Sequence, residues 1–356
     1  MTLLAGNCKI NFALLTLICI FVRMKRKGII IALAILAVIA IAAACVAKFY
    51  IFAGWSGDDV RVNIEAGADV KQALTSQLGA SFGSKVYSMW KWQHGTPEAA
   101  HGSYLIKNGD EAVRVARRIV NGKQTPVRIT FNNIRTIGDL ASRISSQLEI
   151  DSAGFMAACD TILPQKGFTA EHYTAAFLPD TYEFYWTVAP SKLFEKLLDE
   201  HNRFWTADRK AKAAALGLSE NEVNTLASIV ASESNKSDEW GKIARLYLNR
   251  INKNMPLQAD PTVVFALGDF SIRRVTGEHL KVNSPYNTYT HRGLPPGPIR
   301  MVERSQIDAV LNAPAHNYLY MCAKPDFSGY HNFATDYNRH RLNAALYYRA
   351  LNERGI

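Results

Sequence analysis

Residues 219–233, SENEVNTLASIVASE, contain the clearest helix signal of the C-terminal region. The stretch begins with a capping box, because the Ser219 hydroxyl can accept a hydrogen bond from the amide three residues on while Glu222 reaches back. Apolar residues follow at spacings of three and four, namely Val223, Leu226 and Val230. The stretch therefore predicts a capped helix with one apolar face.

Glu233 occupies the next position of that apolar face, three residues after Val230, whereas Ala231 falls off the face. A carboxyl group on a buried face loses the hydration that its ionised form needs, so its pKa rises. A neutral carboxylic acid near pH 7 can act as a general acid. The competing interpretation is structural, with Glu233 forming an ion pair with a buried arginine such as Arg245 or Arg250.

Three loop segments downstream are rich in proline, glycine and hydrogen-bonding side chains. They are residues 257–262 (LQADPT), 284–289 (SPYNTY) and 293–299 (GLPPGPI). Tyr, Asn, Gln and Asp on such rigid loops are suited to binding sugar hydroxyls and stacking on sugar faces. Each loop alone is also an ordinary turn, and Asp260 before Pro261 is equally a turn and helix-start signal.

The other elements of this region indicate an α+β fold. A second helix is expected from Ser237 to about Asn254, because its apolar residues recur at helical spacing. A C-terminal helix is expected over residues 336–353, and residues 318–321 resemble a short strand.

The net charge of +10 is concentrated at the N-terminus. Residues 1–54 contain six Lys or Arg and no Asp or Glu, which leaves only about +4 for residues 55–356. That remainder is ordinary for a globular region, so the composition does not indicate a nucleic-acid partner.

Residues 28–47 form an uncharged, strongly apolar run of 20 residues. As a helix the run is about 30 Å long, which matches the hydrocarbon core of a bilayer. The basic cluster in residues 23–27 predicts that its N-terminal end faces the cytoplasm and that the rest of the chain lies beyond the membrane. A cleaved signal peptide is the alternative. Residues 1–23 are interpreted as an upstream artefact, with translation beginning at Met24, or as a cytoplasmic tail.

Between this anchor and the informative C-terminal region, two further parts are expected. Residues 55–150 predict a small α/β module with strands near 60–64, 103–106 and 127–131. Residues 151–218 predict a helical connecting region. Two cysteines beyond the anchor and no metal-like spacing of Cys or His predict neither a disulfide framework nor a metal site.

At the loops the sequence resembles the YceG-like family, which comprises membrane-anchored endolytic transglycosylases of bacterial peptidoglycan. The resembling motifs occur in the order of the family: residues 177–182 (FLPDTY), 226–233, 258–263 (QADPTV), 286–289 (YNTY) and 293–299. The resemblance is strong over about 170–350. Over 55–150 it is mainly architectural, and there it implies a LysM-like module. Residues 219–356 would then be the catalytic domain.

One departure from the family pattern concerns activity. The family has two glutamates two residues apart after the Ile-Val pair, and here the first is Ala231 while the second, Glu233, remains. If the second glutamate is the acid, this chain is active. If the first is the acid, the chain is a noncatalytic peptidoglycan-binding scaffold on the membrane.

The resemblance implies non-hydrolytic cleavage of the MurNAc-β-1,4-GlcNAc bond within glycan strands. One carboxyl, Glu233, would protonate the glycosidic oxygen and then deprotonate the C6 hydroxyl, leaving a 1,6-anhydro-MurNAc end. An ordinary hydrolase needs two carboxylates, and Asp260 is the rival second one. The expected substrate-binding residues are Gln258, Asp260, Thr262, Tyr286, Asn287 and Tyr289.

The same resemblance implies location and partners. The expected site is the inner (plasma) membrane, with one spanning helix and the catalytic domain on the periplasmic or wall-facing side. Peptidoglycan strands are the substrate, penicillin-binding proteins are the expected protein partners, and no cofactor is expected.

Overall fold

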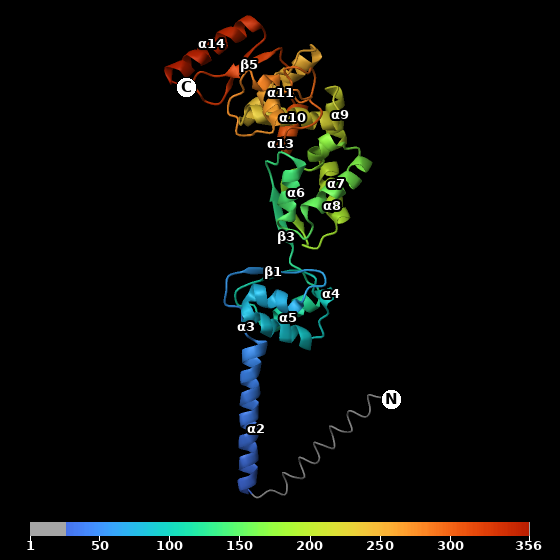
Figure 1. The fold of residues 1–356 in the computed structure, drawn as a ribbon, viewed down its shortest axis with the longest axis vertical. Coiled ribbons are helices and arrows are strands. Elements are labelled where there is room, and N and C mark those ends of the chain that lie inside the picture. Colours follow the sequence, from blue (N-terminus) through green and yellow to red (C-terminus); the bar gives the residue numbers. More distant parts are fainter. Residues whose placement is uncertain (1–25, 356) are drawn as a thin grey trace. The chain divides into compact units, whose positions relative to one another are not determined.

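The computed structural model describes residues 26–355, and the chain divides into two compact units at the Thr125–Pro126 boundary (Figure 1). Helices combine with three separate two-stranded antiparallel sheets in the described residues. The predicted α+β class is therefore confirmed. The domain boundaries drawn from the sequence at 150 and 218 stay predictions.

The first unit begins with the apolar helix α2 (Arg26–Val46), which continues as a π-helical turn, η1 (Ala47–Ile51). Residues Gly28–Ile51 form one helical run that is long and apolar enough to cross a membrane, and none of its most apolar window is buried in protein. This apolar helix suggests membrane anchoring. The interpretations placed on residues 1–23, and the start at Met24, lie outside the described residues.

The rest of the first unit is a small α/β body. Its elements are β1 (Val60–Ile64), α3 (Val70–Trp92), α4 (Pro97–Ala100), β2 (Gly102–Ile106) and α5 (Ala112–Val120). Strands β1 and β2 pair antiparallel, and their inward side chains pack with α3 and α5 around buried Leu74, Tyr104 and Ile119. The strands predicted near 60–64 and 103–106 are confirmed. Helix α3 is interrupted at Gly79, whose φ of 74° only glycine adopts without strain.

The first half of the second unit is built around a second antiparallel pair of strands. Its elements are β3 (Val127–Phe131), α6 (Ile137–Ser145), α7 (Ser152–Ile162), η2 (Pro164–Lys166), η3 (Ala170–Ala176), β4 (Asp180–Phe184), α8 (Pro190–Phe204) and α9 (Ala207–Ala215). Strand β3 forms as predicted and pairs with β4, so it belongs to the second unit. Phe155, Phe177 and Phe194 pack together with tilted and edge-to-face rings in the core that α6, α7 and α8 cover.

The second half of this unit includes residues 219–233. Its elements are α10 (Glu220–Glu233), α11 (Ser237–Asn252), α12 (Asp260–Leu267), η4 (His279–Lys281), α13 (Arg304–Leu311), β5 (Tyr320–Ala323), β6 (His331–Ala334) and α14 (Tyr337–Glu353). The predicted capping box is present, since the Ser219 hydroxyl accepts from the Glu222 amide and the Glu222 carboxylate accepts from the Ser219 amide. The predicted second and C-terminal helices correspond to α11 and α14.

Helix α10 lies at the centre of the second core, which Figure 1 shows with α11 and α13 beside it. Every residue from Val223 to Ala231 is buried, so the helix has no solvent face along this length. The expectation that only one face of the helix is buried was therefore wrong, because Ala231, which lies off the stripe of Val223, Leu226 and Val230, is itself only 4% exposed. Segments that follow α10 in the chain pack against the sides of the helix that its apolar spacing had not marked as buried.

Candidate active site

Glu233 is the last residue of α10, where the helix leaves the core. Its side chain is partly exposed, in contrast to the buried turns before it. The Tyr247 hydroxyl on α11 donates a hydrogen bond of 2.7 Å to Glu233 Oε1. Two adjacent helices therefore position this carboxyl group.

The environment of Glu233 favours its neutral form. Burial raises its pKa from 4.5 to about 7, the nearby Asp260 carboxylate adds to the rise, and the Tyr247 hydrogen bond and the Arg250 charge oppose it. Near pH 7 the group is thus divided between its acid and its conjugate base. A carboxyl in this state can both give and take a proton.

The ion-pair interpretation of Glu233 is wrong. Arg245 Nη2 donates to the Ala313 carbonyl at 2.8 Å. Arg250 donates to backbone carbonyls as well, among them Leu257 O at 2.6 Å. Within residues 26–355 Glu233 takes part in no salt bridge, so Arg250 acts on it only as a nearby charge.

A cavity of about 230 Å³ opens beside Glu233. Three of the residues predicted to bind substrate line it together with Glu233, namely Gln258, Asp260 and Tyr289. The Tyr289 hydroxyl donates a hydrogen bond to Asp260 Oδ1. Burial and the Asp260 carboxylate both raise the pKa of Tyr289, so the phenol keeps its proton and can donate it.

Gln258 reaches the cavity through an unusual backbone conformation. Its φ of 53° lies in the left-handed region, and its amide donates to Thr288 O at 3.1 Å. The Gln258 side chain is exposed, and its carbonyl oxygen accepts from Arg250 Nη1 at 3.4 Å. Its side-chain amide nitrogen carries two hydrogens, a donor type that suits a sugar hydroxyl.

The other three predicted binding residues are not among the residues that line this cavity. Thr262 is fully buried, and its hydroxyl bonds to Ala259 O at 2.7 Å and to Thr288 Oγ1 at 2.9 Å. Tyr286 packs its ring on Phe265 with centroids 4.8 Å apart. Both residues join α12 to the 284–289 loop.

Asn287 is fully buried, and its side chain is fully occupied by the loop itself. Its Nδ2 donates to Leu280 O and Val282 O, each at 2.9 Å, and its Oδ1 accepts from the Tyr289 amide at 3.1 Å. These bonds use both amide hydrogens. Asn287 therefore shapes the loop that presents Tyr289 and does not line the cavity.

A known protein family matches most of this chain. The sequence profile of the YceG-like family matches residues 59–345. This chain belongs to the YceG-like family. The match includes Glu233 and every residue predicted to bind substrate.

Curated relatives of the YceG-like chain carry one name. A Bacillus subtilis (strain 168) protein named endolytic murein transglycosylase is 27% identical over 285 residues, which cover 74% of this chain and 79% of that protein. A Streptococcus pneumoniae (strain ATCC BAA-255 / R6) protein of the same name is 29% identical over 169 residues, which cover 45% of this chain and 30% of that protein.

A solved structure supports the fold of the YceG-like chain. The crystal structure of a yceG-like protein from Listeria monocytogenes aligns with a TM-score of 0.54 and 23% identity, covering 80% of this chain and 98% of that one. At this identity the likeness concerns the fold alone.

Tyr247 and His331 also line the YceG-like cavity, although no sequence signal had marked them as site residues, and Arg250 lines it without the predicted ion pair to Glu233. His331 Nδ1 lies 2.9 Å from Glu239 Oε2, and the His331 amide donates to Glu239 Oε1 at 3.0 Å. Because Glu239 is 92 residues away in sequence and only 5% exposed, no local pattern marks this pair.

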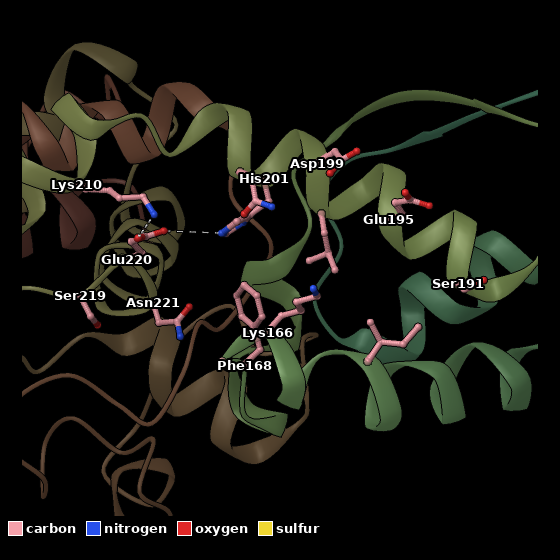
Figure 2. Close-up of a pocket in the computed structure, with 14 residues that line it drawn as sticks. Lys166, Phe168, Ser191, Glu195, Asp199, His201, Lys210, Ser219, Glu220 and Asn221 are labelled. Carbon is pink, nitrogen blue, oxygen red and sulfur yellow. Dashed lines mark ion pairs between the residues drawn. The ribbon is translucent and has the colours of Figure 1, made fainter.

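A larger cavity of about 720 Å³ lies elsewhere in the second unit. Figure 2 shows Lys210 and Glu220 facing each other there, with His201 beside them. Burial lowers the pKa of His201 to about 4, so the imidazole is neutral at pH 7. None of the residues predicted to be catalytic or to bind substrate lines this cavity, so cavity volume alone does not identify the candidate active site.

Proposed function

We propose that this YceG-like protein is an endolytic peptidoglycan lytic transglycosylase that cleaves the MurNAc-β-1,4-GlcNAc bond within glycan strands. The observation that carries the proposal is the Glu233 carboxyl, which has a pKa of about 7 and lines a cavity walled by polar side chains. The names of the curated relatives agree with it.

In the first step Glu233 acts as the general acid. It donates its proton to the glycosidic oxygen, which leaves as the C4 hydroxyl of GlcNAc while positive charge develops at C1 and the ring oxygen of MurNAc. A pKa of about 7 keeps a large share of the group protonated at neutral pH. An exposed glutamate would be almost fully ionised there.

In the second step the same carboxylate acts as a base. It takes the proton from the C6 hydroxyl of MurNAc, and O6 forms a bond to C1 to give the 1,6-anhydro ring. Glu233 is thereby returned to its acid form, and no water is consumed. One carboxyl suffices for both steps, in contrast to a hydrolase, which needs a second carboxylate for water or for a covalent intermediate.

The residues around Glu233 have proposed roles in this scheme. Gln258 and Tyr289 bind sugar hydroxyls, with Asp260 orienting the Tyr289 phenol through their hydrogen bond. Tyr247 orients Glu233. Thr262, Tyr286 and Asn287 act indirectly by shaping the loops, because their polar groups or rings are engaged within the protein.

Two alternative functions predict either a different product or no product. Asp260 lines the same cavity, so a muramidase with Asp260 as second catalyst would release reducing ends. Ala231, which replaces the family's first glutamate, keeps a noncatalytic wall-binding scaffold as the other candidate. Such a scaffold would bind sacculi and release no glycan.

The experiment is digestion of purified sacculi followed by mass spectrometry of the released fragments. Wild type should yield anhydro-muramyl ends, each one water lighter than a reducing end. Glu233→Gln should fold and lose about 10²–10⁴-fold in rate, the usual contribution of a general acid. Glu353→Gln is the matched control, since Glu353 is exposed on α14. Full activity of Glu233→Gln would end this mechanism.

For location, we propose a single-pass protein of the inner (plasma) membrane. The apolar run 28–47 would be the anchor, the basic cluster before it would face the cytoplasm, and both units beyond it would face the cell wall. Residues 55–150 would be a LysM-like module, and penicillin-binding proteins would be partners. Protease accessibility of the two units in spheroplasts tests this orientation.

A further inference from the structure

A second cavity, of about 340 Å³, adjoins the cavity of Glu233. Asp260 lines both, so the two share a wall. The residues that line it include Arg135, Asp260, Phe265, Phe270, Arg273 and Arg300. All belong to the second unit.

The charged side chains around this second cavity are mostly positive. Three arginines line it against one carboxylate, Asp260, which already accepts the Tyr289 hydrogen bond. Within residues 26–355 none of the three arginines forms a salt bridge. Three cations that share a partly buried cavity with a single carboxylate repel one another, so an anionic ligand would be favoured.

Arg300 is the most enclosed of the three. Its Nη2 donates to the neutral Asn133 Oδ1 at 2.6 Å, while its buried Nε has no partner among the described residues. Burial lowers its pKa, and the charge of Arg135 lowers it further. The Glu303 carboxylate opposes this shift in pKa, but it forms no salt bridge with Arg300 within residues 26–355, so the guanidinium has no directly paired counter-charge there.

Arg135 is a second guanidinium group that lines this cavity. It is exposed, and its guanidinium carbon lies 4.2 Å from the centre of the Phe270 ring. Stacking on an aromatic ring leaves the edge of the guanidinium free to donate two parallel hydrogen bonds to a carboxylate. Phe265 and Phe270 give the cavity an apolar side next to its cationic side.

We propose that this second cavity binds the anionic stem peptide carried by the muramyl sugar next to the bond that Glu233 cleaves. The proposal rests on the proposed function, because it assumes that a glycan strand occupies the Glu233 cavity. A stem peptide combines carboxylates with short aliphatic side chains, which matches arginines beside phenylalanine rings. The shared Asp260 wall lets one substrate occupy both cavities.

Binding is tested with the full-length Glu233→Gln protein in detergent, so that substrate is not consumed. The probes are soluble glycan fragments with stem peptides, the same fragments after amidase has removed the peptides, and fragments whose peptide carboxylates are amidated. Peptide-bearing fragments should bind about tenfold more tightly than either of the others, and the advantage should shrink as salt is added. Equal affinity for all three probes would overturn the proposal.

Two arginine variants locate the effect. Arg135→Gln should lose about tenfold in affinity for peptide-bearing fragments and less than twofold for peptide-free ones. Arg274→Gln is the matched control, because Arg274 is exposed and follows Arg273 directly but does not line the cavity. An equal loss on both fragments for Arg135→Gln, or an equal effect of Arg274→Gln, would refute peptide recognition here.

Cleavage by wild type separates this proposal from the proposed function. If wild type releases anhydro ends equally well from peptide-bearing and peptide-free strands, peptide recognition fails and the transglycosylase function stands. If wild type and Glu233→Gln cleave alike, the proposed function fails, whereas the binding comparison still decides whether the arginine cavity recognises the peptide.

Discussion

Replacing Tyr247 with Phe removes the hydrogen bond that reaches the Glu233 carboxyl at 2.7 Å. That bond favours the ionised form of Glu233 and lowers its pKa, whereas burial and Asp260 raise it. Tyr247→Phe should therefore raise the pKa of Glu233 above its value of about 7.

The size of this effect follows from the difference between two hydrogen bonds. A bond to a charged acceptor contributes about 1.5–3 kcal/mol and a bond to a neutral one about 0.5–1.5 kcal/mol. Tyr247 thus favours the carboxylate by roughly 1.4 kcal/mol, which corresponds to about one pH unit in the pKa. We expect the pKa of Glu233 to move from about 7 to about 8.

The assay is the pH dependence of kcat/KM on solubilised glycan strands. Because the first step needs the protonated acid, activity of wild type should fall as pH rises through about 7, and that limb should lie about one unit higher in Tyr247→Phe. Carbon-13 NMR of the glutamate carboxyls gives the pKa directly. A limb that moves to lower pH, or a wild-type pKa near that of an exposed glutamate, would refute the reasoning.

Three further predictions concern stability and support of the site. Glu233→Gln should be more stable than wild type above pH 7, by at most about 3 kcal/mol, and equal to it near pH 4; thermal unfolding at several pH values measures this. The sign follows because the folded state retains a proton between pH 4.5 and about 7 that the unfolded state has lost, so wild type loses stability as pH rises through that window. Glu239→Gln should lower activity and destabilise the fold by about 1.5–3 kcal/mol, because the buried carboxylate accepts from both the amide and the ring of His331; urea unfolding that matched wild type would contradict this. Asn287→Ala should cost about 2–3 kcal/mol of stability, because three hydrogen bonds are lost. An unchanged melting temperature together with a changed KM would instead indicate that Asn287 contacts substrate.

Local sequence signals predicted the elements of the fold well. The capping box at Ser219 and the alternation in Val60–Ile64 act over a few residues, and both were found as predicted. The pairing of β3 with β4 was not visible, because Val127 lies opposite Phe184 across more than fifty residues of helices and turns. The full burial of α10 was missed for the same reason, since α12 and α13 follow it in the chain.

The part of the candidate site that could be predicted consists of residues whose side-chain type alone indicates the chemistry. Glu233 and Asp260 are carboxyls beside apolar or rigid segments, and the structure brings them to one cavity. Asn287 looked equally suited to bind sugar, but only the path of the chain decides whether an amide faces a ligand or its own loop. The Glu239–His331 pair needed tertiary structure, because neither residue has a distinguishing neighbour in sequence.

The position of Glu233 as the final residue of α10 has a consequence for its acidity that no neighbouring side chain supplies. The aligned peptide dipoles of a helix place partial negative charge at its C-terminus, and the last turn of α10 contains no basic residue to offset it. The backbone itself therefore disfavours the carboxylate, by an amount on the order of 0.3–1 kcal/mol. Were Glu233 placed away from this helix C-terminus with the same neighbouring side chains, it would be a stronger acid.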